Sequence, residues 1–184
     1  MATDHELIQE IQGGSDAATE VLVKKYYNII YAFIYRKTGD KHLAYDLTQE
    51  VFIKMMKNIP SYSTKKGNFK SWLFTIAVNH CRDYFKSKSF RTASKIDELD
   101  DQIPSDSRDI HYIFENKEKR KEIKQAIDEL PDYQKEAILL KYYHDLKIKE
   151  IAKITDANES TVKSRLKQGL SKLKSSLKQH TKVN

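Results

Sequence analysis

Cysteine, glycine and proline are scarce in this 184-residue chain, which has one cysteine, five glycines and three prolines. A single cysteine excludes an intramolecular disulfide, and we expect Cys81 to be an inert residue of a hydrophobic core. The shortage of glycine and proline leaves long segments without helix breakers, and alternating strand patterns are almost absent. The sequence therefore predicts an all-α protein.

Long apolar runs and an N-terminal signal peptide are also missing, which predicts a cytoplasmic protein without direct membrane insertion. The six histidines are scattered, and none has a carboxylate or a thiol at a convincing metal spacing. A catalytic cluster of carboxylates or histidines is likewise missing. We therefore expect no catalytic residue, no metal and no cofactor.

Positive charge is in excess, with 33 Lys and Arg against 26 Asp and Glu and a net charge of +7. An excess of this size suits a polyanionic partner such as nucleic acid. Hydrophobic residues recur every three or four positions, as in amphipathic helices. The predicted helices span residues 4–11, 16–37, 41–57, 69–87, 114–130, 133–143, 148–154 and 159–177.

The stretch from residue 91 to 110 interrupts this pattern, because its centre is acidic, contains Pro104 and has no helical period. Such composition is typical of a flexible linker. We predict two small helical domains, residues 1–90 and 111–184, joined by this acidic linker.

Residues 148–177 read as a helix-turn-helix, in which Asn158 is the expected N-cap of the second helix and Asp156 lies in the turn. The apolar stripe expected to dock this helix on the core is Val162, Leu166, Leu170, Leu173 and Leu177. The exposed polar side with its flanking lysines contains Ser160, Thr161, Lys163, Ser164, Arg165, Lys167 and Gln168. A recognition helix in a DNA major groove needs such a surface, and the alternative is a solvated lysine-rich helix.

The third predicted helix carries an acidic stripe beside its apolar one. The stripe consists of Asp46, Gln49, Glu50 and Ile53, spaced as one helix face. Negative charge would repel DNA, so the stripe is either a solvated face or a docking surface for a basic protein partner.

The fourth predicted helix has a polar stripe opposite its broad apolar arc. The polar stripe contains Thr75, Asn79, Arg82 and Lys86, and Trp72 falls beside it. A tryptophan at the edge of a basic, amide-bearing face can stack on an unpaired base. Packing against a neighbouring helix is the alternative.

Four segments in this order resemble the sigma-70 family of RNA polymerase sigma factors, in its extracytoplasmic-function group. Residues 46–52 are similar to the D-x-x-Q-E-x-F signature of the helix that binds core polymerase. Residues 69–79 are similar to the F-x-x-W-L-x-x-I-A-x-N promoter-melting helix. Residues 130–143 and 150–166 resemble the family's upstream-element reader. The chain departs from the family at Tyr45, Lys86 and residues 155–156.

The resemblance implies an alternative sigma factor that binds bacterial core RNA polymerase and recognises the −10 and −35 promoter elements. Asp46, Gln49, Glu50 and Ile53 would then dock on the clamp helices of the polymerase. Trp72, Thr75, Asn79, Arg82 and Lys86 would face the start-proximal element, and the loop of residues 59–68 would hold a flipped base. The polar side of residues 160–168 would contact the upstream element, and the linker would thread through the polymerase.

The family resemblance also implies an anti-sigma factor, membrane-linked or soluble, which would tether the protein to a membrane only indirectly. A stand-alone helix-turn-helix repressor or activator is the alternative function, and it leaves the acidic stripe and Trp72 unexplained.

Overall fold

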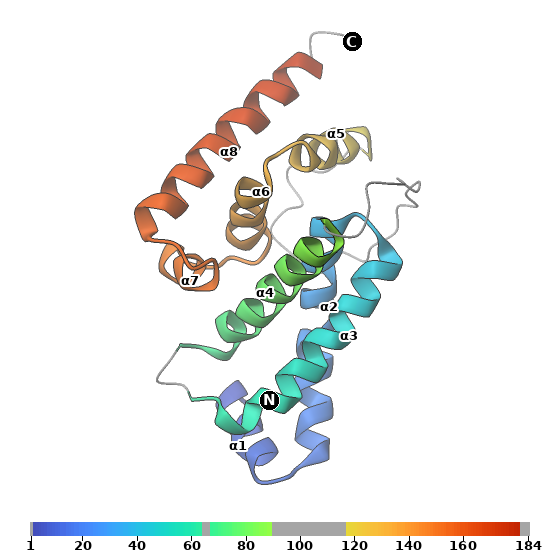
Figure 1. Ribbon diagram of the computed structural model, residues 1–184, viewed down its shortest axis with the longest axis vertical. Coiled ribbons are helices and arrows are strands. Elements are labelled where there is room, and N and C mark those ends of the chain that lie inside the picture. Colours follow the sequence, from blue (N-terminus) through green and yellow to red (C-terminus); the bar gives the residue numbers. More distant parts are fainter. Residues whose placement is uncertain (1, 64–66, 90–116, 181–184) are drawn as a thin grey trace. The chain divides into compact units, whose positions relative to one another are not determined.

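The computed structural model describes residues 2–63, 67–89 and 117–180, and across these ranges it contains helices and no strand (Figure 1). The predicted all-α class is confirmed. The described helices form two compact units, one from α1 to α4 and one from α5, α6, α8 and most of α7. The predicted linker of residues 91–110 lies outside the described residues.

The first unit is a bundle in which α2, α3 and α4 pack on one another and α1 packs on α2 and on the short turn η1 (Figure 1). Its elements are α1 (Asp4–Gln12), α2 (Asp16–Thr38), α3 (Lys41–Asn58), the 3-10 turn η1 (Ile59–Ser61) and α4 (Phe69–Ser89).

Local capping explains where these helices begin and end. The Ser15 side chain accepts a hydrogen bond from Ala18 N–H and starts α2. Gly39 ends that helix with a left-handed φ of 74°, and the Asp40 carboxylate then caps α3 at Leu43 N–H. Each side-chain cap stabilises its helix by about 1 kcal/mol, which fixes the lengths of α2 and α3.

Aromatic and aliphatic side chains fill the centre of the first unit. Phe33 of α2 and Phe74 of α4 are fully buried with ring centroids 5.3 Å apart at 84°. An edge-to-face pair of this kind adds about 0.5–1.5 kcal/mol to the burial of the two rings. Cys81 is buried and unbonded to another cysteine, as predicted. This core holds α3 and α4 side by side, so the exposed faces of these two helices are fixed relative to each other.

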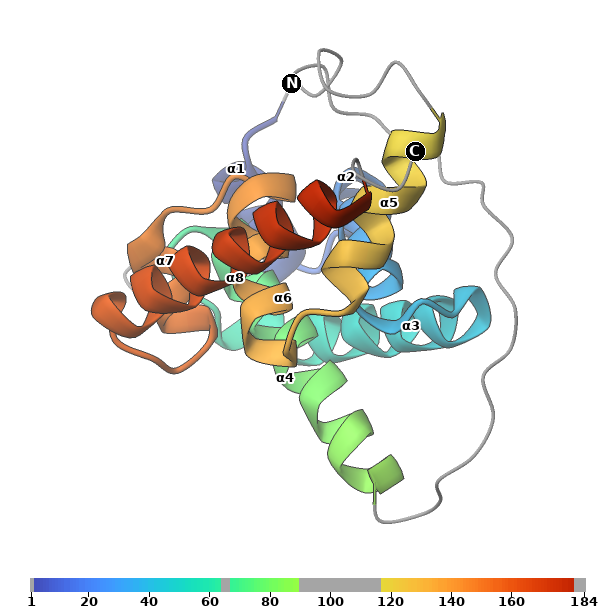
Figure 2. The ribbon, with the colours of Figure 1, turned by 90° about the horizontal axis from the view of Figure 1, so that it is seen from above.

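In the second unit α8 packs along α5 and α6 (Figure 2). Its elements are α5 (Lys117–Asp128), α6 (Asp132–Ile138), the π-helical turn η3 (Leu139–Tyr143), α7 (Ile148–Ile154) and α8 (Glu159–His180). The continuous α-helix predicted over residues 133–143 is wrong in its second half, because the backbone widens into η3. Leu140, buried in this turn, uses its carbonyl to accept from Leu146 N–H at 3.1 Å, which ties the following loop to the core.

The apolar stripe predicted for α8 is wrong at Leu170, which is 42% exposed. Gly169 takes the contact position, since it follows Val162 by seven residues, or about two helical turns. A Cβ at Gly169 would lie only 3.2 Å from Cγ1 of Ile138 in α6. The missing side chain therefore lets α8 approach α6 closely. Within the described ranges, the chain has no helix with the length and hydropathy needed to cross a bilayer.

Candidate functional site

The acidic stripe of α3 lies on the exposed outer face of that helix, as its spacing predicts. Ile53 is 45% exposed, and two further large side chains, Tyr45 and Met56, are 54% and 44% exposed. Tyr45, Ile53 and Met56 lie on one side of α3 at helical spacing, and Tyr45 and Met56 are not among the residues predicted for this surface. An exposed apolar row beside carboxylates favours a protein-docking surface over a merely solvated face.

Glu50 also faces α4, where its carboxylate lies 2.7 Å from Nε2 of His80. Lys54 Nζ lies 2.7 Å from Nδ1 of the same ring. An ammonium group only donates, so Nδ1 accepts and the ring proton is on Nε2, facing Glu50. Burial and the Lys54 charge lower the pKa of His80, against the opposing effect of Glu50. The neutral imidazole thus connects an anion and a cation of α3 to α4.

A hollow of about 270 Å³ lies between η1 and α4. Its lining consists of Asn58, Ser61, Tyr62, Ser63, Trp72 and Ile76. The Trp72 ring is half-buried and packs against Tyr62 and Phe69, with centroids 4.9 and 5.5 Å away. Trp72 thus packs on two aromatic neighbours and also forms a wall of the hollow, while its stacking on an unpaired base stays a prediction. An aromatic wall beside hydroxyl and amide groups can accept a planar polar ring such as a nucleobase.

The polar stripe of α4 continues from this hollow along the helix. Asn79 and Lys86 are exposed, whereas Thr75 and Arg82 are half-buried. Thr75 Oγ1 donates to the carbonyl of Ser71 at 3.0 Å, so its proton is used within the helix. From Trp72 to Lys86 the stripe extends about 21 Å at the rise of an α-helix, which is long enough to follow several nucleotides.

The predicted helix-turn-helix is confirmed in α7 and α8. Asn158 caps α8, and its Oδ1 accepts from Thr161 N–H and from Ser160 Oγ, both at 2.7 Å. Asp156 has φ 50°, the left-handed conformation expected of the turn. The cap thus fixes the first turn of α8, where Ser160 and Thr161 begin the polar side of the helix.

Two α6 residues that were not predicted as site residues, Tyr133 and Gln134, contact the polar side of α8. The Arg165 guanidinium lies over the Tyr133 ring, 5.6 Å from its centroid. The nearly fully buried Gln134 donates from Nε2 to Gln168 Oε1 at 3.0 Å, and Gln168 Nε2 donates to Ser164 Oγ at 3.2 Å. Since Ser164 accepts in this chain of bonds, its hydroxyl proton is left to donate to a ligand.

The remaining predicted residues of α8 lie on the same outer side. Ser160, Lys163 and Lys167 are exposed and Thr161 is half-buried. Short hydroxyl groups between lysines suit contacts with phosphates and base edges. No group of three or more His, Cys, Asp or Glu side chains in the described part of the chain is arranged to hold a metal ion.

Two family models match the chain. The model of sigma-70 region 2 matches residues 22–91, and the model of sigma-70 region 4 matches residues 120–173. In the first unit the match covers most of α2 and all of α3, η1 and α4. In the second unit it covers most of α5 and α8 and all of α6, η3 and α7.

Several curated proteins are similar over most of the chain. The ECF RNA polymerase sigma factor SigM of Bacillus subtilis is 36% identical over 162 residues, covering 83% of this chain and 91% of SigM. SigW of the same organism is 30% identical over 178 residues, covering 93% of this chain and 95% of SigW. Other relatives are longer: the chain spans 60% of the length of the ECF sigma factor BldN of Streptomyces coelicolor, at 29% identity over 86% of this chain.

A similar fold occurs in the sigma factor RpoE of Bartonella quintana, solved in complex with the anti-sigma factor NepR. The two structures superpose with a TM-score of 0.70 at 22% identity, over 86% of this chain and 96% of RpoE.

Proposed function

Because the chain belongs to the extracytoplasmic-function group of the sigma-70 family, we propose that it binds bacterial core RNA polymerase and directs initiation at specific promoters. The observation that carries this proposal is the pair of family-model matches, region 2 on the first helical unit and region 4 on the second. In this proposal residues 1–90 and 111–184 are the two functional domains and residues 91–110 their linker. The protein acts in the cytoplasm, where the polymerase is.

The outer face of α3 is the proposed docking surface for the clamp helices of core polymerase. Asp46 and Glu50 supply negative charge, and Ile53 supplies exposed apolar area next to them. Tyr45 and Met56 extend this apolar area along the helix. Complementary charge speeds encounter and fixes register, while apolar area provides affinity.

The α4 stripe and the hollow next to η1 are the proposed site for the start-proximal promoter element. Trp72 forms one wall of the hollow, whose size suits one extruded base. Asn79, Arg82 and Lys86 then follow the single strand away from it. Flipping a base costs a few kcal/mol, and stacking on aromatic rings offsets part of that cost.

The polar side of α8 is the proposed reader of the upstream element in the major groove. Arg165 is the residue suited to a bidentate contact with a guanine edge, and Ser164 is placed as a donor. Lys163 and Lys167 flank them and suit phosphate contacts. Contacts from two separate domains then select a promoter by two elements at once.

An anti-sigma factor is the proposed regulator. The similar RpoE fold is known in complex with the anti-sigma factor NepR, which supports the same kind of partner for this chain. A membrane-linked partner would hold the protein at the membrane without any helix of its own inserted.

Run-off transcription with purified core polymerase tests the proposal. The template is the DNA upstream of the protein's own gene together with a genomic fragment library. We expect promoter-specific transcripts that require the chain, and the common sequences of their start sites give the two elements directly. Tight specific binding of the isolated chain to duplex DNA, without any directed transcription, would instead identify a stand-alone repressor or activator.

A further inference from the structure

Helix α1 lies outside the residues matched by the family models, yet it contacts the wall of the hollow directly. The side-chain amide of Gln12, at the end of α1, donates to the carbonyl oxygens of Ile59 and Tyr62 at 3.0 and 3.2 Å. These carbonyls are at the start of η1 and immediately after its end. One amide group therefore fastens the whole turn that forms one wall of the hollow.

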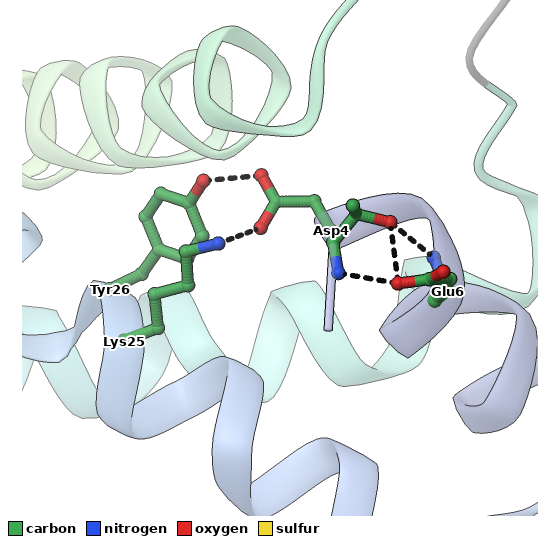
Figure 3. Close-up of polar contacts among 5 residues, drawn as sticks. Asp4, Glu6, Lys25 and Tyr26 are labelled. Atoms are coloured by element: carbon green, nitrogen blue, oxygen red, sulfur yellow. Dashed lines mark hydrogen bonds and ion pairs between the residues drawn. The ribbon is translucent and has the colours of Figure 1, made fainter. Parts of the chain in front are cut away.

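The other end of α1 is anchored to α2. The Asp4 carboxylate accepts from Tyr26 Oη and from Lys25 Nζ, both at 2.6 Å (Figure 3). A reciprocal capping box between Thr3 and Glu6 fixes the same end of the helix. A helix fixed at one end holds Gln12 in place at the other, so the turn is attached to a rigid support.

The same anchor also reaches the opposite wall of the hollow. The Tyr26 ring packs against Phe69, with centroids 5.2 Å apart, and Phe69 packs against Trp72 at 5.5 Å. Burial and the bond to Asp4 raise the pKa of Tyr26, which keeps its hydroxyl protonated as the donor to that carboxylate. Through these contacts α1 is connected to both walls, directly at η1 and through two aromatic rings at Trp72.

We propose that α1 positions the base-binding hollow and that Gln12 is the positioning residue for its η1 wall. This inference rests on the proposed role of the hollow in the start-proximal element. The physical reason is preorganisation, since a wall that is already fixed does not have to be ordered when a base enters. Gln12 touches no base itself and acts through the carbonyls of Ile59 and Tyr62.

The test uses the chain bound to core polymerase and single-stranded oligonucleotides of the non-template start-proximal element. In a series of oligonucleotides, each base in turn is replaced by an abasic site, and affinities are measured by filter binding. The ratio of affinities for intact and abasic strands measures how strongly one base is held. Three variants are compared with the wild type: Gln12→Leu, the isosteric Gln12→Glu, which cannot donate, and the control Gln9→Leu on the exposed side of α1.

We expect both Gln12 variants to reduce that ratio about threefold to tenfold at one position, with unchanged affinity for the strand that is abasic there. Gln9→Leu should keep the wild-type ratio. The inference is overturned if the Gln12 variants keep the wild-type ratio, or if they weaken intact and abasic strands equally. If no abasic site reduces the affinity of the wild type, the hollow does not bind a base. That result would reject the proposed role of the hollow itself, independently of Gln12.

Discussion

Arg165 offers the sharpest test of how α8 contacts DNA. Its guanidinium lies over the Tyr133 ring, 5.6 Å from the centroid, and this contact limits the orientations of the side chain. If these donors read a guanine edge, Arg165→Ala should cost about 1–3 kcal/mol at one base pair. This corresponds to a loss of about fivefold to 150-fold in affinity.

The assay is binding of the polymerase complex to duplexes of the upstream element in which each base pair is replaced in turn. Arg165→Ala should remove discrimination at one base pair and leave the preference at the others intact. Arg165→Lys keeps the charge but lacks the planar fork, so it should lose that discrimination as well. Tyr133→Leu, which removes the ring and retains the guanidinium, should show a smaller loss at the same base pair.

A uniform loss on every DNA sequence would refute base reading by Arg165. In that case the slope of log affinity against log salt concentration should fall by about one, and Arg165→Lys should restore binding. Arg165 would then be a phosphate contact, and the sequence preference of α8 would depend on its hydroxyl and amide groups.

Three other predictions concern α3, α4 and α8. Asp46→Lys should abolish co-purification with core polymerase, while its circular dichroism spectrum stays that of the wild type. The control charge reversal Glu10→Lys on α1 should leave co-purification intact. Unchanged association of Asp46→Lys would reject the docking surface. Because the pKa of His80 is lowered from 6.5 in the fold, the unfolded chain binds the proton first as pH falls. The free energy of unfolding should therefore decrease below about pH 6.5, and urea titrations should show a smaller decrease for His80→Gln. Equal decreases would contradict a neutral imidazole. Gly169→Val should lower the free energy of unfolding by about 1–3 kcal/mol through overpacking against Ile138, and an unchanged melting temperature would contradict the close approach.

Much of the fold could be predicted because its signals are local. Ser15 and Asn158 are caps whose partners lie three residues away, and the exposed stripe of α3 follows from helical period alone. Asp156 adopts a left-handed φ in the short turn of the helix-turn-helix, a conformation that Asp tolerates better than most residues. Local chemistry of this kind is readable in a single sequence.

The features that were missed depend on packing between helices. The contact of Glu50 with His80 and the bond from Gln134 to Gln168 join residues that are close only after the bundles form. The hydrophobic side chain of Leu170 suggests a place in the apolar stripe, but this residue is exposed. Gly169 contacts α6 instead, because it has no side chain to keep the two helices apart. The helical period predicts which face of a helix is exposed, but it does not show which residues of that face contact side chains of a neighbouring helix. The roles of the predicted contact residues stay predictions until the binding experiments are done.

Trp72 has a practical consequence because it is the chain's one tryptophan among eleven tyrosines. Indole emission from the isolated protein therefore comes from a single known place, the wall of the hollow beside Tyr62. A base stacking there would quench this emission, and a movement of η1 would change the polarity around the ring. The protein thus contains its own optical reporter, and occupancy of the hollow can be followed in real time without attaching a dye.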